Sequence, residues 1–587
     1  MTAQADWHLT RFVQNLRPRV RGEVSLALAQ RGGLLGPVSA VSPLPSVSPA
    51  TAASSAAVGG AEPLPETLPG CRLAPRDPAD VSVALALASE SGMPVLFGSR
   101  FPPPGSPAAI DAFARCRARG WLLIDDQVHL GHVGTFDRDR GFIEVEAGVR
   151  LAELNRFLMP HGLWLPIEGA QAAGRTVASL VATNEGALNP AWGAMVDRLL
   201  GVDALLADGT AQLFGPFGSN SSINLRSGRA GQMVSALFGL AAGVEEQIRQ
   251  HWPAGLRQPD AYLLDCFRPR PARPYTPDGS VNLAHLLAGS QGTLAWSARL
   301  QLRLLPRPGH HQAALFVFAS LMDALKPLPA LLSLQPSALL LVDGRGLQAL
   351  IDSDEAADRA LVQDAAAAWQ RVGAGESVAA AQAVAVLIRF SGDDEAGCRY
   401  GLRAVMDLLG AHRVCAEEGV ALLRVEGLSP SKAGRRVPSD RLTEPVWWRL
   451  FDGGQQAAFD LDTLVAARHH GWLAPVQGQP ATLAMAPLPG QPARLVAVAG
   501  ALEKACRRVG IRLSWRGDLL GGVLCLRPLD GTVDPARVWA FLAEAVGRLQ
   551  AGRWHPGLAA AFADVRRLFD PGQILAPGVV SGRGRVD

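Results

Sequence analysis

Residue types that bind metal ions are sparse in this chain. His129 and His132 form an HxxH pair in a predicted turn after Asp125 and Asp126, but no third ligand is evident nearby. The seven cysteines are odd in number and include no CxxC pair, which argues against a disulfide framework and against a zinc or iron–sulfur cluster. We therefore assign no metal site, and we expect reduced thiols in a cytoplasmic protein.

The glycine signatures of several common enzyme sites are also missing. The sequence contains no GxGxxG after a predicted strand, no GxxxxGK followed by Ser or Thr, and no GxSxG. Rossmann-type nicotinamide binding, P-loop phosphoryl transfer and α/β-hydrolase chemistry therefore have no support.

The composition indicates a folded protein of several domains. A chain of 587 residues is too long for one hydrophobic core, so two or three domains are expected. Hydrophobic residues make up 48% of the chain and charged residues 19%, which is typical of a globular protein. The net charge of +3 leaves no surplus for neutralising phosphates, which argues against nucleic-acid binding. The most apolar stretch, 312–342, is interrupted by charged residues, so neither a membrane span nor a secretory signal is predicted.

Predicted elements alternate between helices and strands along the first half of the chain. Residues 37–66 are rich in Pro, Ser, Ala and Gly and are predicted to be a linker. A helix is expected to start near Asp77, and strands are expected at 121–124 and 142–149. Residues 150–162 carry leucines at helical spacing, which predicts a further helix with Gly162 beyond its end.

The second half has the pattern of another α+β domain. A hairpin turn is predicted at Asp208-Gly209, and an alternating strand ends at the prolines near 308. Beyond this point, short apolar strands separate helical segments at 353–385, 397–412, 494–509 and 535–550.

Four collinear blocks carry a resemblance to a known family. They are IEVEAGVRLAELNRFLMPHGLWLP with RTVASLVATNEGA, then WGAMVDRLLGVDALLADG, then VNLAHLLAGSQGTLAWSARLQLRLLPRP, and finally LFDPGQILAPG. In this order they resemble the FAD-linked enzymes of the vanillyl-alcohol-oxidase superfamily, which have a PCMH-type FAD-binding domain. The most similar branch is that of D-lactate dehydrogenase, glycolate oxidase and D-2-hydroxyglutarate dehydrogenase.

This resemblance implies an α+β fold with a two-subdomain FAD-binding domain and an α+β cap domain. The implied division is an N-terminal helical segment and linker (1–69), the FAD-binding domain (70–308), the cap or substrate domain (309–550), and a C-terminal helix and tail that pack on the FAD-binding domain (551–587). The implied cofactor is FAD.

The resemblance also assigns residues to the flavin site. A buried pyrophosphate needs backbone N–H donors brought close by small residues, although tight packing alone also explains such residues. In the superfamily the matching positions run along the flavin. They are Gly98, Ser99, Gly105 and Ser106, then Thr176, Val177, Ala178, Ser179, Asn184, Gly186, Gly193, Asp197 and Gly201, then Gly289, Ser290, Gln291, Gly292 and Thr293.

The chain departs from the family pattern at the phosphate loop. A run of glycines is expected near 98–106, where this chain reads GSRFPPPGS, and three prolines remove three N–H donors. The glycines and serines there can form a shorter cradle with Arg100 as countercharge, and a proline-stiffened surface loop explains the segment equally well. Ala178 and Ser179 replace paired glycines, and Gln291 stands at the usual glutamate.

It departs again at the catalytic positions, so the catalytic residues are left unassigned. In the segment GDLLGGVLCLRP, Asp518 and Cys525 stand where the family has two metal-binding histidines. His555 is the only histidine after 471 and is predicted to be a loop residue, and Ala576 replaces an asparagine near the flavin.

Two functions remain open. The first is an FAD-dependent oxidoreductase that moves a hydride from the α-carbon of a small 2-hydroxy acid to the flavin and passes electrons to an iron–sulfur or other acceptor protein. The second is a catalytically degenerate, non-enzymatic accessory subunit or binding protein of a flavin dehydrogenase complex. A substrate carboxylate would need a cation, and the arginines considered for it are Arg175, Arg198, Arg424 and Arg449.

Overall fold

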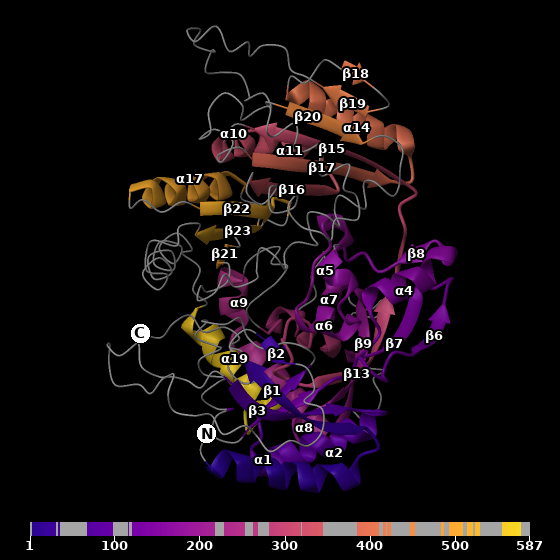
Figure 1. Cartoon of the computed structure of the whole chain (residues 1–587), viewed down its shortest axis with the longest axis vertical. Helices are drawn as coiled ribbons and strands as arrows, with labels where there is room; N and C mark the ends of the chain where they lie inside the picture. The colour runs from indigo at the N-terminus through magenta and orange to yellow at the C-terminus, as the bar shows by residue number, and fades with distance from the viewer. Residues whose placement is uncertain are drawn as a thin grey trace, which may run out of the picture.

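Two α+β domains lie one above the other along the long axis of the molecule (Figure 1). This computed structural model describes residues 3–30, 33–35, 67–97, 116, 120–168, 170–217, 228–252, 262–267, 281–318, 320–343, 384–409, 415–417, 420–423, 447–451, 483–485, 492–508, 513–520, 523–528 and 555–576. The predicted α+β class, with a first domain of two sheets followed by a second α+β domain, is confirmed. The exact domain boundaries stay predictions.

The first sheet is built around three parallel strands. They are β3 (Thr67–Ala74), β5 (Leu122–Ile124) and β4 (Val95–Phe97), and β1 (Glu23–Gln30) and β2 (Gly33–Leu35) extend the sheet on the β3 side. All eight residues of β1 pair with β3 in antiparallel register. The N-terminal segment therefore contributes a strand to this sheet.

Two helices cover this sheet. α2 (Pro78–Ser91) starts where the sequence predicts, because the Asp77 carboxylate accepts a hydrogen bond from the Asp80 N–H at 3.1 Å. Gly92, with φ of 62°, ends it in the left-handed conformation that glycine tolerates. α1 (Ala3–Leu16), followed by the 3-10 turn η1 (Arg17–Arg19), packs its apolar residues into the same core.

The second sheet is antiparallel. Its order is β10 (Ala211–Phe214), β9 (Leu199–Leu205), β13 (Trp296–Arg303), β7 (Phe142–Glu146) and β6 (Val133–Asp137). The predicted turn at Asp208-Gly209 joins β9 to β10, and Gly209 has a φ of 80°. β13 alternates between buried and more exposed residues, as its sequence pattern indicates.

Short helices and strand pairs complete this second subdomain. The helices are α4 (Leu151–Leu158), α5 (Ala170–Ala173), α6 (Val177–Ala182), α7 (Met195–Arg198), α8 (Gly228–Gly243) and α9 (Glu245–His251). The 3-10 turns are η3 (Met159–His161), η4 (Pro190–Trp192), η6 (Leu264–Phe267) and η7 (Leu283–Leu286). The paired short strands are β8 (Leu163–Trp164) with β14 (Leu305–Pro306), and β11 (Pro216–Phe217) with β12 (Val281–Asn282).

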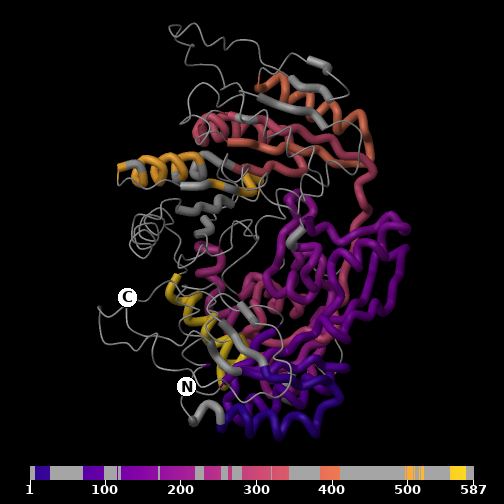
Figure 2. The backbone as a smooth tube through the Cα atoms, viewed as in Figure 1, coloured from indigo at the N-terminus to yellow at the C-terminus, as the bar shows by residue number. Residues whose placement is uncertain are grey.

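The second domain is a nine-stranded sheet with helices on one face. The strand order is β18 (Cys415–Glu417), β19 (Val420–Leu423), β20 (Trp447–Phe451), β15 (His310–Phe318), β17 (Val384–Gly392), β16 (Ala338–Asp343), β22 (Leu513–Asp518), β23 (Val523–Pro528) and β21 (Leu483–Met485). The helices are α10 (Leu321–Leu325), α11 (Leu328–Ser333), α14 (Glu395–Leu408) and α17 (Pro492–Arg508). Figure 2 shows the chain rising from the first domain into this sheet where β14 leads to β15.

The C-terminal segment returns to the first domain, as predicted. α19 (Pro556–Phe569) buries Leu558, Phe562 and Phe569 in the core of the second subdomain. The fully buried Asp570 then accepts hydrogen bonds from the N–H groups of Ile574 and Leu575 at 3.1 and 2.8 Å. This turn delivers residues 574–576 to the edge of β4.

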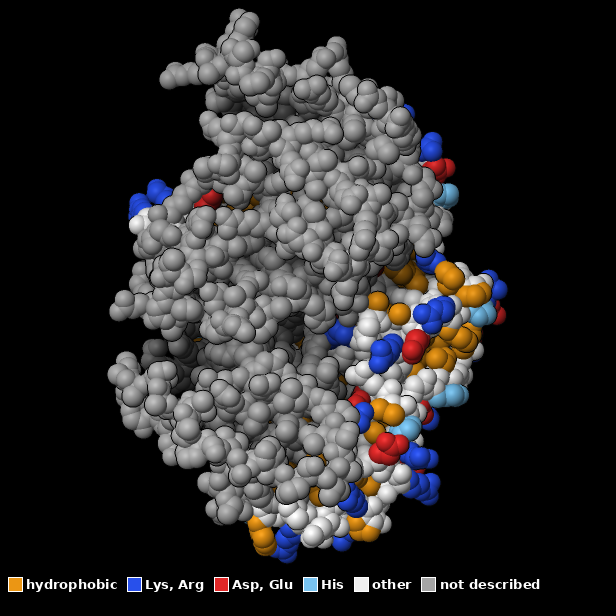
Figure 3. Space-filling model, in the orientation of Figure 1, with side chains coloured by type: hydrophobic (Ala, Val, Ile, Leu, Met, Phe, Trp, Pro, Cys, Tyr) orange, Lys and Arg blue, Asp and Glu red, His pale blue; other side chains and the backbone are white. Residues whose placement is uncertain are grey.

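The described surface has no continuous run of one charge on the face drawn in Figure 3, where basic, acidic and apolar side chains alternate over α4 and β6. None of the helices in the described part of the chain has both the length and the apolar character needed to cross a membrane.

We expect Asp570→Ala to destabilise the first domain by about 3 kcal/mol, because two buried N–H groups lose a charged acceptor. Asp570→Asn keeps one acceptor oxygen and should cost about half as much. Urea unfolding measures both. Asp564→Ala, which removes an exposed ion pair with Arg567 on the same helix, is the control. Equal effects of Asp570→Ala and Asp564→Ala would contradict this role.

Candidate functional site

α6 runs between the cores of the two subdomains. The Thr176 hydroxyl caps it by accepting a hydrogen bond from the Ser179 N–H at 3.2 Å. Val177, Leu180 and Val181 are buried in the core of the second subdomain. Ala178 is half-buried and packs against both cores. The predicted flavin segment therefore lies at the junction of the two subdomains.

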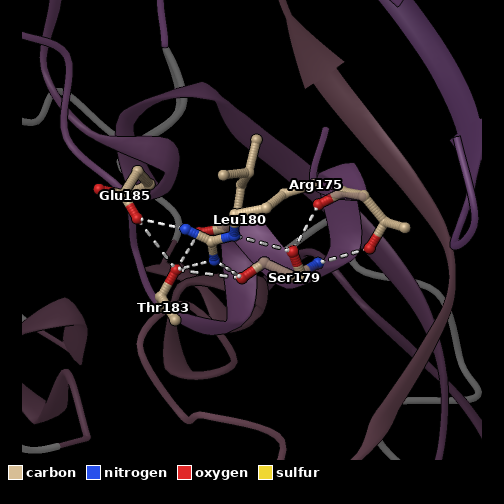
Figure 4. Close-up of polar contacts among 6 residues, drawn as sticks. Arg175, Ser179, Leu180, Thr183 and Glu185 are labelled. Atoms are coloured by element: carbon tan, nitrogen blue, oxygen red, sulfur yellow. Dashed lines mark hydrogen bonds and ion pairs between the residues drawn. The ribbon is translucent and has the colours of Figure 1, made fainter. Parts of the chain in front are cut away.

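Arg175 holds one side of α6 in place (Figure 4). Its guanidinium donates to the Ser179 carbonyl and to the Thr183 hydroxyl, both at 2.8 Å, and forms an ion pair of 2.7 Å with Glu185. Side-chain exposures of 22% and 28% leave this pair partly shielded from water. Arg175 therefore supports the helix, which leaves it poorly placed to bind a substrate carboxylate.

The turn at 289–293 is joined to the end of α6. The N–H of Gly289 donates to the Val181 carbonyl at 3.0 Å, and the N–H of Gln291 donates to the Ala182 carbonyl at 2.7 Å. Gly289, Gln291 and Gly292 have φ of 78°, 54° and 74°. The turn places the exposed Gln291 in a conformation that costs a non-glycine residue about 1 kcal/mol. Within the turn, Ser290 and Thr293 are buried.

The block from 184 to 201 is explained mainly by internal packing. The Asn184 amide oxygen accepts a hydrogen bond from the Val196 N–H at 2.9 Å. Gly186 forms an isolated antiparallel β-bridge with Ala194. A side chain at Gly193 would approach the Asp197 carboxylate to 2.6 Å. At Gly201 it would approach the Gln301 side chain to the same distance. These four predicted residues, with Asp197, shape the loop that supports α6.

The end of β4, which precedes the predicted phosphate loop in the sequence, meets the same place. Phe97 ends β4, and a Cβ atom on Gly292 would lie 3.0 Å from its ring. On its other side, β4 exchanges backbone hydrogen bonds with Ile574 and Ala576. Gly98, Ser99, Gly105 and Ser106 themselves lie outside the described residues.

The residues present fit a dinucleotide cofactor. Three segments far apart in sequence meet at one junction, namely the end of β4, α6 and the 289–293 turn. Small half-buried residues lie in α6, in the loop after it and in the turn, namely Ala178, Ala182, Gly186 and Gly292. Gly292 lets the turn approach Phe97 closely, because a Cβ atom at this position would lie only 3.0 Å from the phenyl ring. Several backbone donors of α6 and the turn are already used internally, so the phosphates would depend on donors from 98–106.

The catalytic side of the site differs from the family pattern. Asp518 is the last residue of β22 and lies opposite Leu340 of β16. Cys525 lies in the neighbouring strand β23, opposite Arg516 of β22. No group of three metal-binding side chains occurs in the part of the chain that the structure describes. His555 caps α19, because its Nδ1 accepts the Gly557 N–H at 3.2 Å. Of the other arginines considered for a substrate carboxylate, Arg198 has a buried Nε without a hydrogen-bond partner. Arg449 lies in β20, opposite Leu315 of β15 in the sheet register. Arg424 lies outside the described residues.

Two charged residues, Arg389 and Glu168, were not predicted to have a role, and the burial of a third, Asp126, was not predicted either. Arg389 is the only charged residue of the strand VAVLIRFSG, and its side chain forms a fully buried ion pair with Glu168. A charge inside an apolar strand is the signal that a buried partner exists. Asp126 is 5% exposed, and its carboxylate accepts a hydrogen bond from Trp296 Nε1 at 3.4 Å.

Comparison with known proteins agrees with this geometry. Residues 69–215 match the family model described as an FAD binding domain. The chain therefore carries an FAD-binding domain. The cofactor that this domain takes is FAD. The predicted resemblance to the FAD-linked enzymes of the vanillyl-alcohol-oxidase superfamily and the predicted cofactor are thus confirmed.

Curated relatives share the first domain at low identity. The chain is 24% identical over 288 residues to D-2-hydroxyglutarate dehydrogenase of Pantoea ananatis, covering 48% of this chain and 27% of the relative. For the protein of the same name in Escherichia coli the identity is 25%, covering 41% and 23%. For mitochondrial D-lactate dehydrogenase [cytochrome] 1 of Saccharomyces cerevisiae it is 29%, covering 25% and 24%. The chain thus spans about a quarter of the length of these relatives.

Solved structures support the fold alone. Alkyldihydroxyacetonephosphate synthase superposes with a TM-score of 0.50 at 12% identity, covering 86% of this chain and 76% of that one. 4-Ethylphenol oxidase from Gulosibacter chungangensis superposes with a TM-score of 0.50 at 15% identity, covering 87% and 89%.

We expect Arg175→Met to weaken FAD binding about tenfold, because the guanidinium makes two hydrogen bonds to Ser179 in α6 and one each to Thr183 and Glu185 just beyond its C-terminal end. A fluorescence titration of apoprotein with FAD measures the dissociation constant. Arg150→Met is the matched control, since its exposed guanidinium reaches only Gln127. If both variants bind FAD equally well, Arg175 does not order the flavin segment.

We expect Asp126→Asn to stabilise the protein in a pH-dependent way. Burial raises the pKa of Asp126 from 3.8 to about 6, an effect that the Trp296 hydrogen bond reduces and the Asp125 charge increases. The folded protein therefore binds this proton more tightly than the unfolded chain, and the stability gained from protonation is lost as pH rises from about 4 through about 6. The change corresponds to about 3 kcal/mol. Calorimetry should show that the free energy of unfolding of the variant is higher than that of wild type by up to this amount at pH 7.5. At pH 4 the two free energies of unfolding should be equal. A difference that is independent of pH would refute the assignment.

Proposed function

We propose that the chain is an FAD-dependent oxidoreductase that oxidises a small 2-hydroxy acid. The contact between β4, α6 and the 289–293 turn supports this proposal, because these are segments that we predict to lie at or next to the flavin. The substrate class rests on the names of the relatives, which are D-2-hydroxyglutarate and D-lactate dehydrogenases. When bound, FAD supplies a hydride acceptor for the substrate α-carbon.

The chain's own residues would hold and enclose the cofactor. α6 and the turn would present small residues to the flavin, while Arg175 keeps α6 rigid. The second domain would cover the site with the face of its sheet that carries Arg389 and Asp518. Electrons would leave to an acceptor protein, for which an iron–sulfur protein is our first candidate.

A second candidate is a catalytically degenerate accessory subunit that binds FAD without turnover. The observation that favours it is the presence of Asp518 and Cys525 where the superfamily has metal-binding histidines. An imidazole can take the proton of the substrate hydroxyl near neutral pH, whereas a thiol in an alternating strand is more often a core residue.

We expect the purified protein to show flavin absorption bands that bleach when a 2-hydroxy acid is added without oxygen. D-2-hydroxyglutarate, D-lactate and glycolate should be compared, with the L enantiomers of the first two as matched controls. Flavin bands that none of these acids bleaches would favour the accessory subunit. A protein that is colourless and stays so after FAD titration would contradict both candidates.

A further inference from the structure

The second domain presents one face of its sheet to helices and the other toward the first domain. Leu339, Leu341, Val386 and Ile388 point into the core beneath α10, α14 and α17. Side chains alternate along a strand, so Leu340, Leu387 and Arg389 lie on the opposite face. Asp518 pairs with Leu340 and therefore lies on that same face.

An ion pair joins this second face to the stretch of chain that precedes the predicted flavin segment. Arg389 Nη2 lies 2.7 Å from Glu168 Oε1, and the two side chains are 0% and 1% exposed. The pair links residues 221 positions apart in sequence. Glu168 precedes α5 and α6, and Figure 1 shows α5 directed at the sheet of the second domain.

The arginine is held rigidly from its own side. The Ser337 hydroxyl donates to the Arg389 carbonyl at 2.9 Å, and it lies 2.8 Å from the Ser391 hydroxyl. His311 Nδ1 contacts Ser391 at 2.8 Å. Burial and the nearby Arg389 charge lower the pKa of His311 to about 4, so this histidine is neutral at physiological pH.

Glu168 is less completely satisfied. Its Oε2 atom is buried and has no hydrogen-bond partner. Burial raises the pKa of Glu168, Arg389 opposes this effect, and the nearby Asp518 adds to it. A buried ion pair with an oxygen left over is often no more stable than a pair of apolar residues of the same size. Stability alone therefore does not account for the pair.

We propose that Glu168 and Arg389 are a positioning pair that sets the place of the second domain over the flavin segment. Leaving either buried charge without its opposite charge would be strongly destabilising, so the ion pair favours the register between the sheet and the chain entering α5 and α6 in which the two charges meet. The order of the flavin segment and the docking of the second domain are thereby coupled. The effect on FAD rests on the proposed function, whereas the docking does not.

The decisive variant is the double replacement Glu168→Met with Arg389→Met. Apolar side chains of similar length remove both charges together, so neither is left buried and alone, and the thermal stability should stay close to that of wild type. If the pair positions the domains, FAD should nevertheless bind at least tenfold more weakly, and the radius of gyration of the FAD-free chain should increase in small-angle scattering. Glu395→Gln with Arg399→Gln, which removes an exposed ion pair of α14, is the matched control.

The outcomes separate the possible roles. A double variant that matches the control in FAD affinity and in radius of gyration overturns the proposal, because the pair is then merely structural. If the double variant does not fold, Glu168→Gln is judged by the same two measurements, since Gln keeps a hydrogen bond to Arg389 without the charge. If the wild-type chain binds no FAD, the proposed function fails, and the radius of gyration of the FAD-free variants still decides whether the pair sets the docking.

Discussion

The first domain depends on close contact between two hydrophobic cores at α6. Ala178 packs against both cores at once, with Val177 and Val181 buried on one side. A large side chain at this position would separate the two subdomains, because protein interiors leave no room for one. The same contact brings the 289–293 turn against the end of α6, and this turn in turn meets Phe97 at the end of β4. The candidate cofactor site exists because the cores approach this closely.

Loss of the paired glycines at 178 and 179 costs this arrangement little. Positive φ angles occur at Asn184, Gly193 and Gly289, but not within α6. The glycines of the superfamily are therefore not needed here for backbone freedom, and alanine and serine favour a helix over glycine. What changes is the space beside the backbone, by one methyl and one hydroxymethyl group. These groups would change how closely a bound cofactor can approach the backbone, and they leave the fold unchanged.

Sequence patterns predicted the local structure well, because each signal acts over a few residues. Asp77 caps α2, Gly162 ends the turn after α4 with φ of 68°, and Gly209 closes the hairpin, all at the predicted places. The assignment of the flavin segments came from resemblance, and their individual contacts with FAD stay predictions. The pairing of β1 with β3 was not predicted, because 36 residues separate Gln30 from Thr67 in the sequence and local patterns carry no information across such a gap.

The Arg389–Glu168 pair marks the limit of sequence reasoning more sharply. Each half leaves a local trace, since Arg389 interrupts an apolar strand and Glu168 follows the buried Leu165 and Ile167. Neither sequence signal identifies the residue that forms the ion pair, because any opposite charge that the fold brings near would satisfy it. Only the docking of the two domains decides which opposite charge Arg389 meets. The ion pair in turn restricts the docking, because a fully buried cation favours the position of the sheet against the first domain in which it meets Glu168.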